Sequence, residues 1–472
     1  MDLAVNCQPL HQKNDSDDSE AEQSSSETQQ CDDILPDDAS PSSKTSDRLI
    51  KYGNPRDGYN VAFFIFYLLG MTTLLPWNFF ITPDHYWMYK LREVSDNSTV
   101  PSNGRTPLQA EFTSYLSLAA NVPNTVFMIL GALYGKRIPL KLRMIGSLAL
   151  ILVLFLVTTS LVYVNTDTWQ QSFFILTLAT VVILNVGTAI MNLGLYGIVG
   201  SFPHRYITAV VGGQALGGVF AALANIVSIW LGASPQSSAL AYFLVADIVL
   251  ATSVIAYLAL SSSPFFKFYM GLRHQNVPFS PTDDGDSNVL PSDISFRRIQ
   301  KKIWVHCFSI LMVFVVTIGA FPGITVLINS VHKANKKPWN YIYFVPVVGF
   351  LIFSICDYAG RLFAGWLRRP KRNQWLLALL SILRIAFIPL FMFCNAEPRN
   401  SLPVLIDSDA YYVLIMMAFA LSNGYLANII FINVPSLTSN AEVETASQII
   451  TAWLSMGTSI GAGLSLLMIR LL

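Results

Sequence analysis

The chain alternates between long apolar segments and shorter polar connections. A helix needs about 20 mainly apolar residues to cross the hydrocarbon core of a bilayer. In the first half, uncharged stretches long enough for this run over Gly58–Pro83, Phe112–Gly135, Met144–Thr166, Thr168–His204 and Tyr206–Ala246. The last of these accommodates a helix to about Leu231, a turn, and the start of a sixth helix that continues to about Ser262. The first half therefore predicts six membrane-spanning helices.

The second half repeats this pattern after a polar connection rich in Pro, Gly and Asp. Five further helices are predicted at about 303–330, 341–367, 374–394, 408–433 and 447–471. The expected fold is an all-α polytopic membrane protein with eleven transmembrane helices, arranged as six plus five. Its expected parts are a cytosolic tail at 1–58, a six-helix bundle at 59–262, a cytosolic central loop at 263–302 and a five-helix bundle at 303–472.

Composition favours a membrane protein over a soluble one. Of the 472 residues, 53% are hydrophobic and 12% are charged, whereas a soluble domain carries about 25% charged residues. So little charge cannot cover a water-facing surface of this size. The net charge of +1 gives no indication of a nucleic-acid partner. Residues 1–58 are rich in Ser, Asp, Glu and Gln, and this composition predicts a disordered tail.

Basic residues near the helix ends indicate the orientation. Lys and Arg concentrate on the connections that share a side with residues 1–58, which predicts a cytosolic N-terminus. The segment from Lys333 to Lys337 goes against this bias locally. Asn97 begins the glycosylation sequence Asn-Ser-Thr in the first connection expected on the outer side, and this supports the same orientation.

Charged residues within the apolar segments are the first candidates for a functional site, because charge in hydrocarbon is costly. Asp357 and Arg361 have i, i+4 spacing, so both fall on one helical face and can neutralise each other. They indicate either a polar site that lines a substrate cavity or a structural pair that holds helices together. Asp247 and Arg384 are also central in their segments. We interpret these two as structural, and no spacing indicates a contact between them.

Two prolines interrupt apolar segments at matching positions of the two halves. Pro76 lies in the first segment and Pro322 in the seventh. Broken helices at corresponding positions indicate the substrate site in transporters built from repeats, but prolines are also common in ordinary membrane helices. Uncharged polar residues such as Gln214 fit interhelical hydrogen bonding. The spacings Gly213-x-x-x-Gly217 and Gly457-x-x-x-Gly461 predict close helix packing.

The sequence lacks the motifs that would indicate an enzyme or a nucleotide-driven pump. It has no phosphate-binding loop of the G-x-x-x-x-G-K-[ST] type, no nucleophile elbow and no spacing typical of a metal site. We therefore expect no catalytic residues, no metal and no cofactor, and no obligate protein partner is evident. A carrier, a channel and a membrane scaffold remain. Scattered polar residues rather than a pore-lining ring favour the carrier over the channel.

Six short motifs, in order along the chain, resemble signatures of the equilibrative nucleoside transporter family, solute carrier family 29. They are Leu74–Thr82 (LLPWNFFIT), Gly213–Gly218 (GQALGG), Phe321–Thr325 (FPGIT), Asp357–Arg361 (DYAGR), Ser422–Leu426 (SNGYL) and Glu442–Ala446 (EVETA). The resemblance implies a major-facilitator-like fold and facilitative transport of purine and pyrimidine nucleosides through the bilayer. Nucleobases or another small polar solute are the alternative cargo.

The resemblance also implies where a nucleoside binds. The Asp and Arg of the family's D-x-x-G-R motif, here Asp357 and Arg361, would surround the ribose. Trp77 resembles the residue that packs near the base, and its neighbour Asn78 would complete that end of the site. Asn192 takes the place of a Gln that contacts the nucleoside in plasma-membrane members. Because Asn is one methylene shorter, the base preference stays open.

Within the family, two tracts look most like the endo-lysosomal branch. They are the segment from Ile81 to Arg92 and Gly200–Pro203 with Arg205. That branch is associated with acidic compartments and proton-linked activity. Glu444 matches a carboxylate implicated there, although the wider family shares it. Both the late endosomal or lysosomal membrane and the plasma membrane are therefore expected locations.

Overall fold

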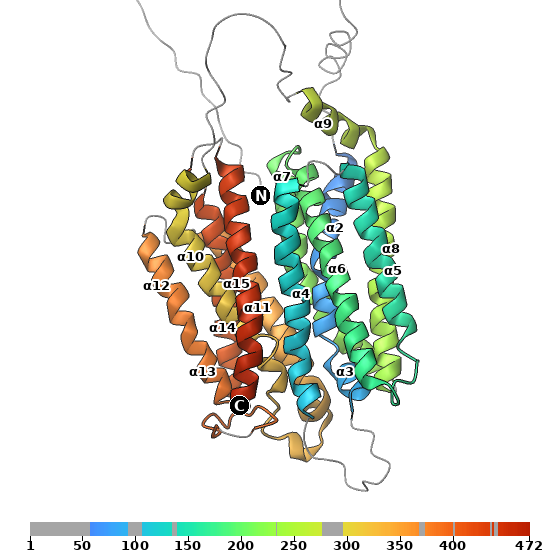
Figure 1. The fold of residues 1–472 in the computed structure, drawn as a ribbon, viewed down its shortest axis with the longest axis vertical. Coiled ribbons are helices and arrows are strands. Elements are labelled where there is room, and N and C mark those ends of the chain that lie inside the picture. Colours follow the sequence, from blue (N-terminus) through green and yellow to red (C-terminus); the bar gives the residue numbers. More distant parts are fainter. Residues whose placement is uncertain are drawn as a thin grey trace, which may run out of the picture. The chain divides into compact units, whose positions relative to one another are not determined.

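The protein is described by a computed structural model. It covers residues 57–92, 106–134, 139–232, 234–275, 296–367, 373–399, 402–434, 437–438 and 442–472. Over these ranges the chain is almost entirely helical, with isolated bridges in place of strands. Figure 1 shows the long helices side by side and roughly parallel to one axis. Nearly all of the tail expected at 1–58 lies outside the described residues.

The first half forms six long helices and two short ones. The long helices are α2 (Val61–Ile81), α4 (Pro107–Tyr134), α5 (Leu140–Ser160), α6 (Gln170–Val199), α7 (His204–Leu231) and α8 (Pro235–Ser262). The short ones are α3 (Asp84–Lys90) and α9 (Pro264–Gln275). The start of α8 illustrates how the sequence sets a boundary, because Ser234 and Ser237 form a reciprocal capping box around Pro235.

The second half forms five long helical segments, of which three are uninterrupted. These three are α10 (Phe296–Ala320), α14 (Asp409–Asn433) and α15 (Val443–Leu471). A fourth begins with the π-helical turns η5 (Trp339–Tyr343) and η6 (Val345–Ile352) and continues as α11 (Phe353–Leu367). The fifth joins α12 (Gln374–Leu383), the 3-10 turn η7 (Arg384–Ala386) and α13 (Phe387–Met392). Irregular turns of this kind often occur at functional sites.

Some boundaries differ from the sequence expectation. The connection expected at 263–302 contains the helix α9 and the first turns of α10, which begins at Phe296. α10 ends at Ala320, earlier than expected, because the ring of Pro322 cannot continue a helix. Pro76, by contrast, lies within the continuous helix α2. Of the two alternatives that the sequence leaves open for this proline, the continuous helix fits an ordinary membrane proline.

Among the described residues, ten helices are long and apolar enough to cross a membrane. The eleventh expected crossing corresponds to α4, which is helical throughout but is not one of the ten. α4 carries Ser117, Asn121 and Asn124, and these polar residues lower its mean hydropathy. The structure confirms an all-helical, multi-pass protein, and the count of eleven crossings stays a prediction.

The long helices form two groups that follow chain order. In Figure 1, α2–α9 lie on one side and α10–α15 on the other. In the first group α2 packs on α7, and α4 and α5 pack on α6; in the second, α10 packs on α15 and α11 on α14. The groups meet where α4 runs along α15, and where α7 runs along η6 and α11.

Glycines allow the closest of these helix pairs. A Cβ added at Gly213 of α7 would collide with the carbonyl oxygen of Tyr67 in α2. One added at Gly424 of α14 would collide with the carbonyl oxygen of Asp357 in α11. A Cβ added at Gly457 of α15 would lie 2.7 Å from the carbonyl oxygen of Leu311 in α10. The glycine spacings in α7 and α15 therefore serve helix packing, as the sequence predicts.

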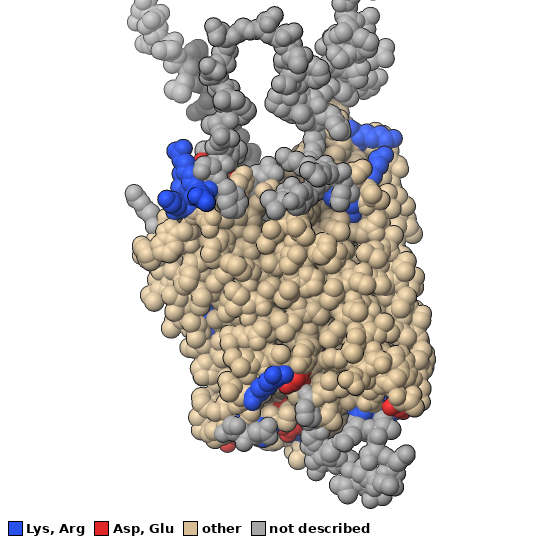
Figure 2. Space-filling model, in the orientation of Figure 1, with Lys and Arg blue, Asp and Glu red and all other residues tan. Residues whose placement is uncertain are grey.

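The middle of the assembly has the surface of a membrane protein. Figure 2 shows the described Lys, Arg, Asp and Glu almost entirely at the two ends of the face in view, with an uncharged band between them. Large apolar side chains lie open on mid-helix positions, including Ile248, Ile255 and Leu414 at 65%, 67% and 60% exposure. Lipid is the solvent that fits such a surface, and helices satisfy their own backbone hydrogen bonds within it.

The two ends carry different charge arrangements. α9 and the start of α10 lie at one end, called the α9 end, while α3 and the last turn of α15 lie at the other, the α3 end (Figure 1). Three ion pairs occupy the α3 end: Arg92–Asp167 at 2.7 Å, Lys333–Glu397 at 2.7 Å and Arg470–Glu111 at 2.9 Å. The segment that goes against the charge bias thus has Lys333 neutralised by a neighbouring carboxylate.

Candidate functional site

Asp357 and Arg361 form the ion pair that their spacing predicts. Both lie on α11, and Arg361 Nε is 2.8 Å from Asp357 Oδ2. Asp357 is buried at 8% exposure, whereas the Arg361 side chain stays 27% exposed. Arg361 donates only through Nε among the described residues, so its two terminal amino groups are available to another acceptor. The buried carboxylate of Asp357 therefore holds Arg361 in place, while one edge of the Arg361 guanidinium stays accessible.

A second helix fixes the other oxygen of Asp357. Asn423 of α14 donates from Nδ2 to Asp357 Oδ1 at 2.7 Å. The close contact of α11 and α14 at Gly360 and Gly424 brings these two side chains within reach. Asn423 Oδ1 accepts in turn from the hydroxyl of Thr317 in α10, at 2.7 Å. The carboxylate is thus held by a network that spans three helices.

Arg384 extends this network and does not contact Asp247. It lies in η7, is 2% exposed, and donates to Thr317 Oγ1 at 2.8 Å and Ser422 Oγ at 2.7 Å. Its guanidinium also lies over the ring of Phe419, 4.9 Å from the centroid. Asp247 instead accepts from Thr159 at 2.7 Å, between α8 and α5. The structural interpretation of both residues agrees with these contacts.

The first helix group holds a separate polar network centred on Gln214 of α7. Gln214 Nε2 donates to Thr73 Oγ1 of α2 at 3.0 Å and, more distantly, to Asn192 Oδ1 of α6 at 3.3 Å. Its Oε1 accepts from the hydroxyl of Tyr196 at 3.0 Å. Asn192 is half-buried and lies one turn before Tyr196 on the same helix. Sequence reasoning thus found Asn192, but it missed Tyr196, which the i, i+4 spacing could have indicated.

The two networks approach each other across the interface between the helix groups. Tyr196 is near enough to Arg361 for an electrostatic interaction. Tyr67 in α2 and Tyr358 in α11 are likewise near enough for an electrostatic interaction. At the α3 end, His85 of α3 bonds through Nε2 to the carbonyl oxygen of Ile342 in η5, at 2.9 Å. Polar side chains of α2, α6 and α7 therefore face those of α11 at mid-depth.

Trp77 and Asn78 lie on α2, and both are half-buried. The amide of Asn78 points at α7, where Cβ atoms added at Gly217 and Gly218 would lie 3.7 and 3.6 Å from it. Gly218 also faces Ser354 of α11. Asn78 thus lies beside the interface between the groups. Trp77 packs against the apolar core.

Two further sequence candidates cannot be placed as side chains. Glu444 lies in the first turn of α15, and its side chain is outside the described part of the structure. Asn97 lies wholly outside the described residues. Within the described ranges, no group of three or more His, Cys, Asp or Glu is arranged to hold a metal ion.

Ten apolar helices in two groups, with charged and amide side chains meeting between them, define an integral membrane protein that crosses the bilayer many times. A family model described as nucleoside transporter matches residues 178–470. The protein therefore belongs to the nucleoside transporter family, a family of transporters rather than enzymes.

Two relatives agree with this assignment, and a solved structure has a similar fold. The chain is 33% identical over 430 residues to equilibrative nucleoside transporter 3 of Rattus norvegicus, covering 88% of this chain and 90% of the relative. It is 35% identical over 451 residues to equilibrative nucleoside transporter 1 of Homo sapiens, covering 88% and 98%. Its fold is similar to that of the nucleoside transporter NupG, with a TM-score of 0.50 at 15% identity over 85% of this chain and 90% of that one. The major-facilitator-like fold expected from the sequence is thereby confirmed.

Proposed function

We propose that the protein carries nucleosides passively across a membrane by alternating access, with the substrate held between the two helix groups. The observation that carries the proposal is the placement of Arg361. Its guanidinium is fixed by a buried carboxylate at 2.8 Å, remains partly exposed, and interacts with Tyr196 of the opposite group. A solute bound there would contact both groups, so rocking of one against the other would transfer it.

The chemistry of the pair suits a ribose. Each oxygen of Asp357 accepts one hydrogen bond from the protein, from Arg361 or from Asn423. A carboxylate oxygen has two lone pairs, so each can still accept from a sugar hydroxyl. Hydrogen bonds to a charged acceptor are roughly twice as strong as neutral ones. Asp357 and Arg361 are therefore proposed to bind the ribose.

The base is proposed to lie toward the first helix group, near Trp77, Asn78 and Asn192. An aromatic wall suits every base because each base has a π-face. Asn192 is tied to Gln214, whose amide and whose partner Tyr196 supply further polar groups beside it. Asn192 is shorter than the Gln found there in plasma-membrane members. We propose that Gln214 supplies part of the polar contact to the base that Asn192 cannot reach.

The orientation proposed from the sequence places the α9 end in the cytosol and the α3 end outside. The distribution of Lys and Arg along the sequence supports this choice, because cytoplasmic ends carry an excess of basic residues. Asn97 is then a proposed glycosylation site on the outer side. Glu444, in the first turn of α15, is the residue proposed to link transport to protons in an acidic late endosome or lysosome; the plasma membrane is the alternative location.

Uptake by the purified protein in proteoliposomes tests the proposal. Radiolabelled adenosine and uridine would be offered at pH 5.5 and 7.4, with excess unlabelled nucleoside as competitor. Saturable, competed uptake is the expected result, and a marked gain at acid pH would favour the endo-lysosomal location. If nucleobases compete for uptake and nucleosides do not, the substrate is a nucleobase and the proposed substrate is wrong. Flux that does not saturate would indicate a channel.

A further inference from the structure

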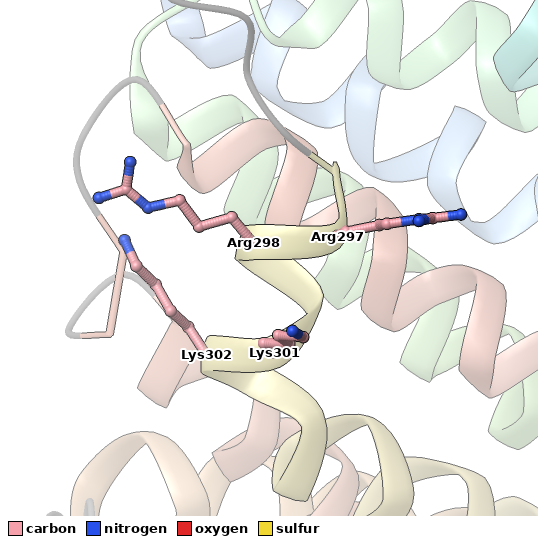
Figure 3. Close-up of a pocket in the computed structure, with 4 residues that line it drawn as sticks. All are labelled: Arg297, Arg298, Lys301 and Lys302. Atoms are coloured by element: carbon pink, nitrogen blue, oxygen red, sulfur yellow. The ribbon is translucent and has the colours of Figure 1, made fainter.

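A compact group of cations lies at the α9 end, apart from the nucleoside site. Arg297, Arg298, Lys301 and Lys302, here called the α10 basic cluster, occupy the first two turns of α10 and line a recess of about 480 Å³. All four side chains are exposed. In Figure 3, Arg298 and Lys302 extend to the same side of the helix with their charged ends close together, while Arg297 points to the other side.

Among the described residues, only one of these four cations has a carboxylate partner. Lys302 pairs with Glu442 at 2.9 Å. Arg297, Arg298 and Lys301 have no carboxylate within ion-pair distance in the described part of the chain. The first turn of α10 contains no acidic residue either, although a helix N-terminus favours negative charge and disfavours positive charge. The cluster is therefore placed where an external anion would relieve unfavourable electrostatics.

Aromatic residues indicate that this anion is at the membrane surface. Trp304, one turn further along α10, is 51% exposed, and Trp375 at the start of α12 is 66% exposed. Their rings are in edge-to-face contact with centroids 5.6 Å apart. Exposed Trp residues at helix ends lie at the level of the lipid headgroups. The α10 basic cluster thus begins just where the hydrocarbon ends.

We infer that the α10 basic cluster binds the phosphorylated headgroup of an anionic membrane lipid, of the polyphosphoinositide type. Among the described side chains, four cations and one carboxylate leave a local charge of +3. A phosphomonoester carries about −1.5 to −2 at neutral pH, so a headgroup with two such groups matches this charge better than a monoanionic lipid does. The guanidinium group of Arg298, which lies close to the ammonium group of Lys302 (Figure 3), can bind a phosphate with two hydrogen bonds. Clusters of four or more cations beside a membrane helix on its cytoplasmic side are typical of such binding.

The experiment compares two double variants of the full chain that remove the same charge. Arg297→Gln/Arg298→Gln changes unpaired residues of the cluster, and Lys336→Gln/Lys337→Gln changes exposed residues at the opposite end. Purified protein in detergent would be titrated with short-chain phosphatidylinositol 4,5-bisphosphate, and bound lipid counted by native mass spectrometry. We expect the first variant to lose about tenfold or more in affinity and the second to stay within about twofold of the unsubstituted protein.

Three outcomes would overturn the inference. Equal lipid binding by both double variants would show that the cluster is not the site. Equal affinity for phosphatidylserine would show that only diffuse charge is recognised. Equal affinity for free inositol trisphosphate would identify a soluble phosphate compound as the ligand. Nucleoside uptake by both variants serves as the folding control, since neither changes a residue of the proposed nucleoside site.

Discussion

Asn423 Nδ2 lies 2.7 Å from Oδ1 of Asp357, although the two residues belong to different helices. Together with Arg361 on Oδ2 at 2.8 Å, this contact fixes the plane of the carboxylate. The sequence leaves open whether Asp357 and Arg361 form a substrate site or a structural pair, and this arrangement is compatible with both. It holds α11 against α14, and it also orients a carboxylate and a partly exposed guanidinium toward the opposite helix group.

Asp357→Asn separates these two roles. The variant keeps the size of the side chain but removes the charge, so the contact with Arg361 is weakened and a ribose hydroxyl loses a charged acceptor. We expect nucleoside uptake to fall roughly ten- to hundredfold. The measurement is nucleoside uptake per folded molecule. Size exclusion and thermal unfolding give the amount of folded protein. Wild-type uptake in a folded variant would leave Asp357 with a structural role alone.

Tyr196→Phe tests the polar group that faces Arg361 from the first helix group. The variant removes the hydroxyl that donates to Gln214 at 3.0 Å and leaves the ring in place. We expect KM for nucleosides to rise about fivefold, the value of one neutral hydrogen bond, with little change in thermal stability. Tyr163→Phe, at an exposed position remote from the interface, is the matched control. An unchanged KM would exclude Tyr196 from the site.

Gly424→Ala tests whether close helix packing positions the carboxylate. A Cβ there collides with the backbone of Asp357, and overpacking of this kind costs roughly 1–3 kcal/mol. We expect a lower thermal midpoint and reduced uptake. Gly463→Ala in α15 is the control, because nothing lies within 4 Å of its Cβ position and Ala stabilises a helix by up to about 1 kcal/mol relative to Gly. Equal midpoints for the two variants would contradict the packing argument.

Arg470→Gln tests closure at the α3 end. Arg470 of α15 pairs with Glu111 of α4 at 2.9 Å and so joins the two helix groups. Below this pair, Ser465 and Ser114 are fully buried and 2.9 Å apart. In a Ser465→Cys background, we expect Arg470→Gln to raise the rate of maleimide labelling roughly two- to threefold. Lys336→Gln, at the same end, should leave the rate unchanged; if both variants label alike, the pair does not hold this end closed.

The sequence predicts the helices well because hydrocarbon imposes length and apolarity on them. It also predicts the Asp357–Arg361 contact, since i, i+4 spacing alone brings these side chains together. Contacts between helices depend on how each helix is rotated about its axis, and spacing within one segment does not contain that information. Arg384 therefore finds Thr317 and Ser422 rather than Asp247. The role of Gln214 as the centre of a network is missed for the same reason.

Proline shows a similar limit. Pro76 and Pro322 look equivalent in the sequence, yet only Pro322 ends a helix. A proline removes one backbone donor, and neighbouring helices and waters can compensate for this within a membrane. α2 packs on α7 and stays continuous through Pro76. The surroundings, rather than the residue, decide whether a break forms.

The polar character of α4 bears on how the protein is made. Its Thr125 hydroxyl finds a partner in Ser459 of α15 at 2.8 Å, 334 residues further along the chain. Ribosomes add about 5–20 residues per second, so α4 leaves the ribosome roughly 15–70 s before that partner exists. During this interval the Thr125 hydroxyl can donate only within α4, to the carbonyl oxygen of Asn121, which lies 2.9 Å away in the folded protein. The packing of α4 on α15 therefore joins the two helix groups only after the last helix of the chain has been made.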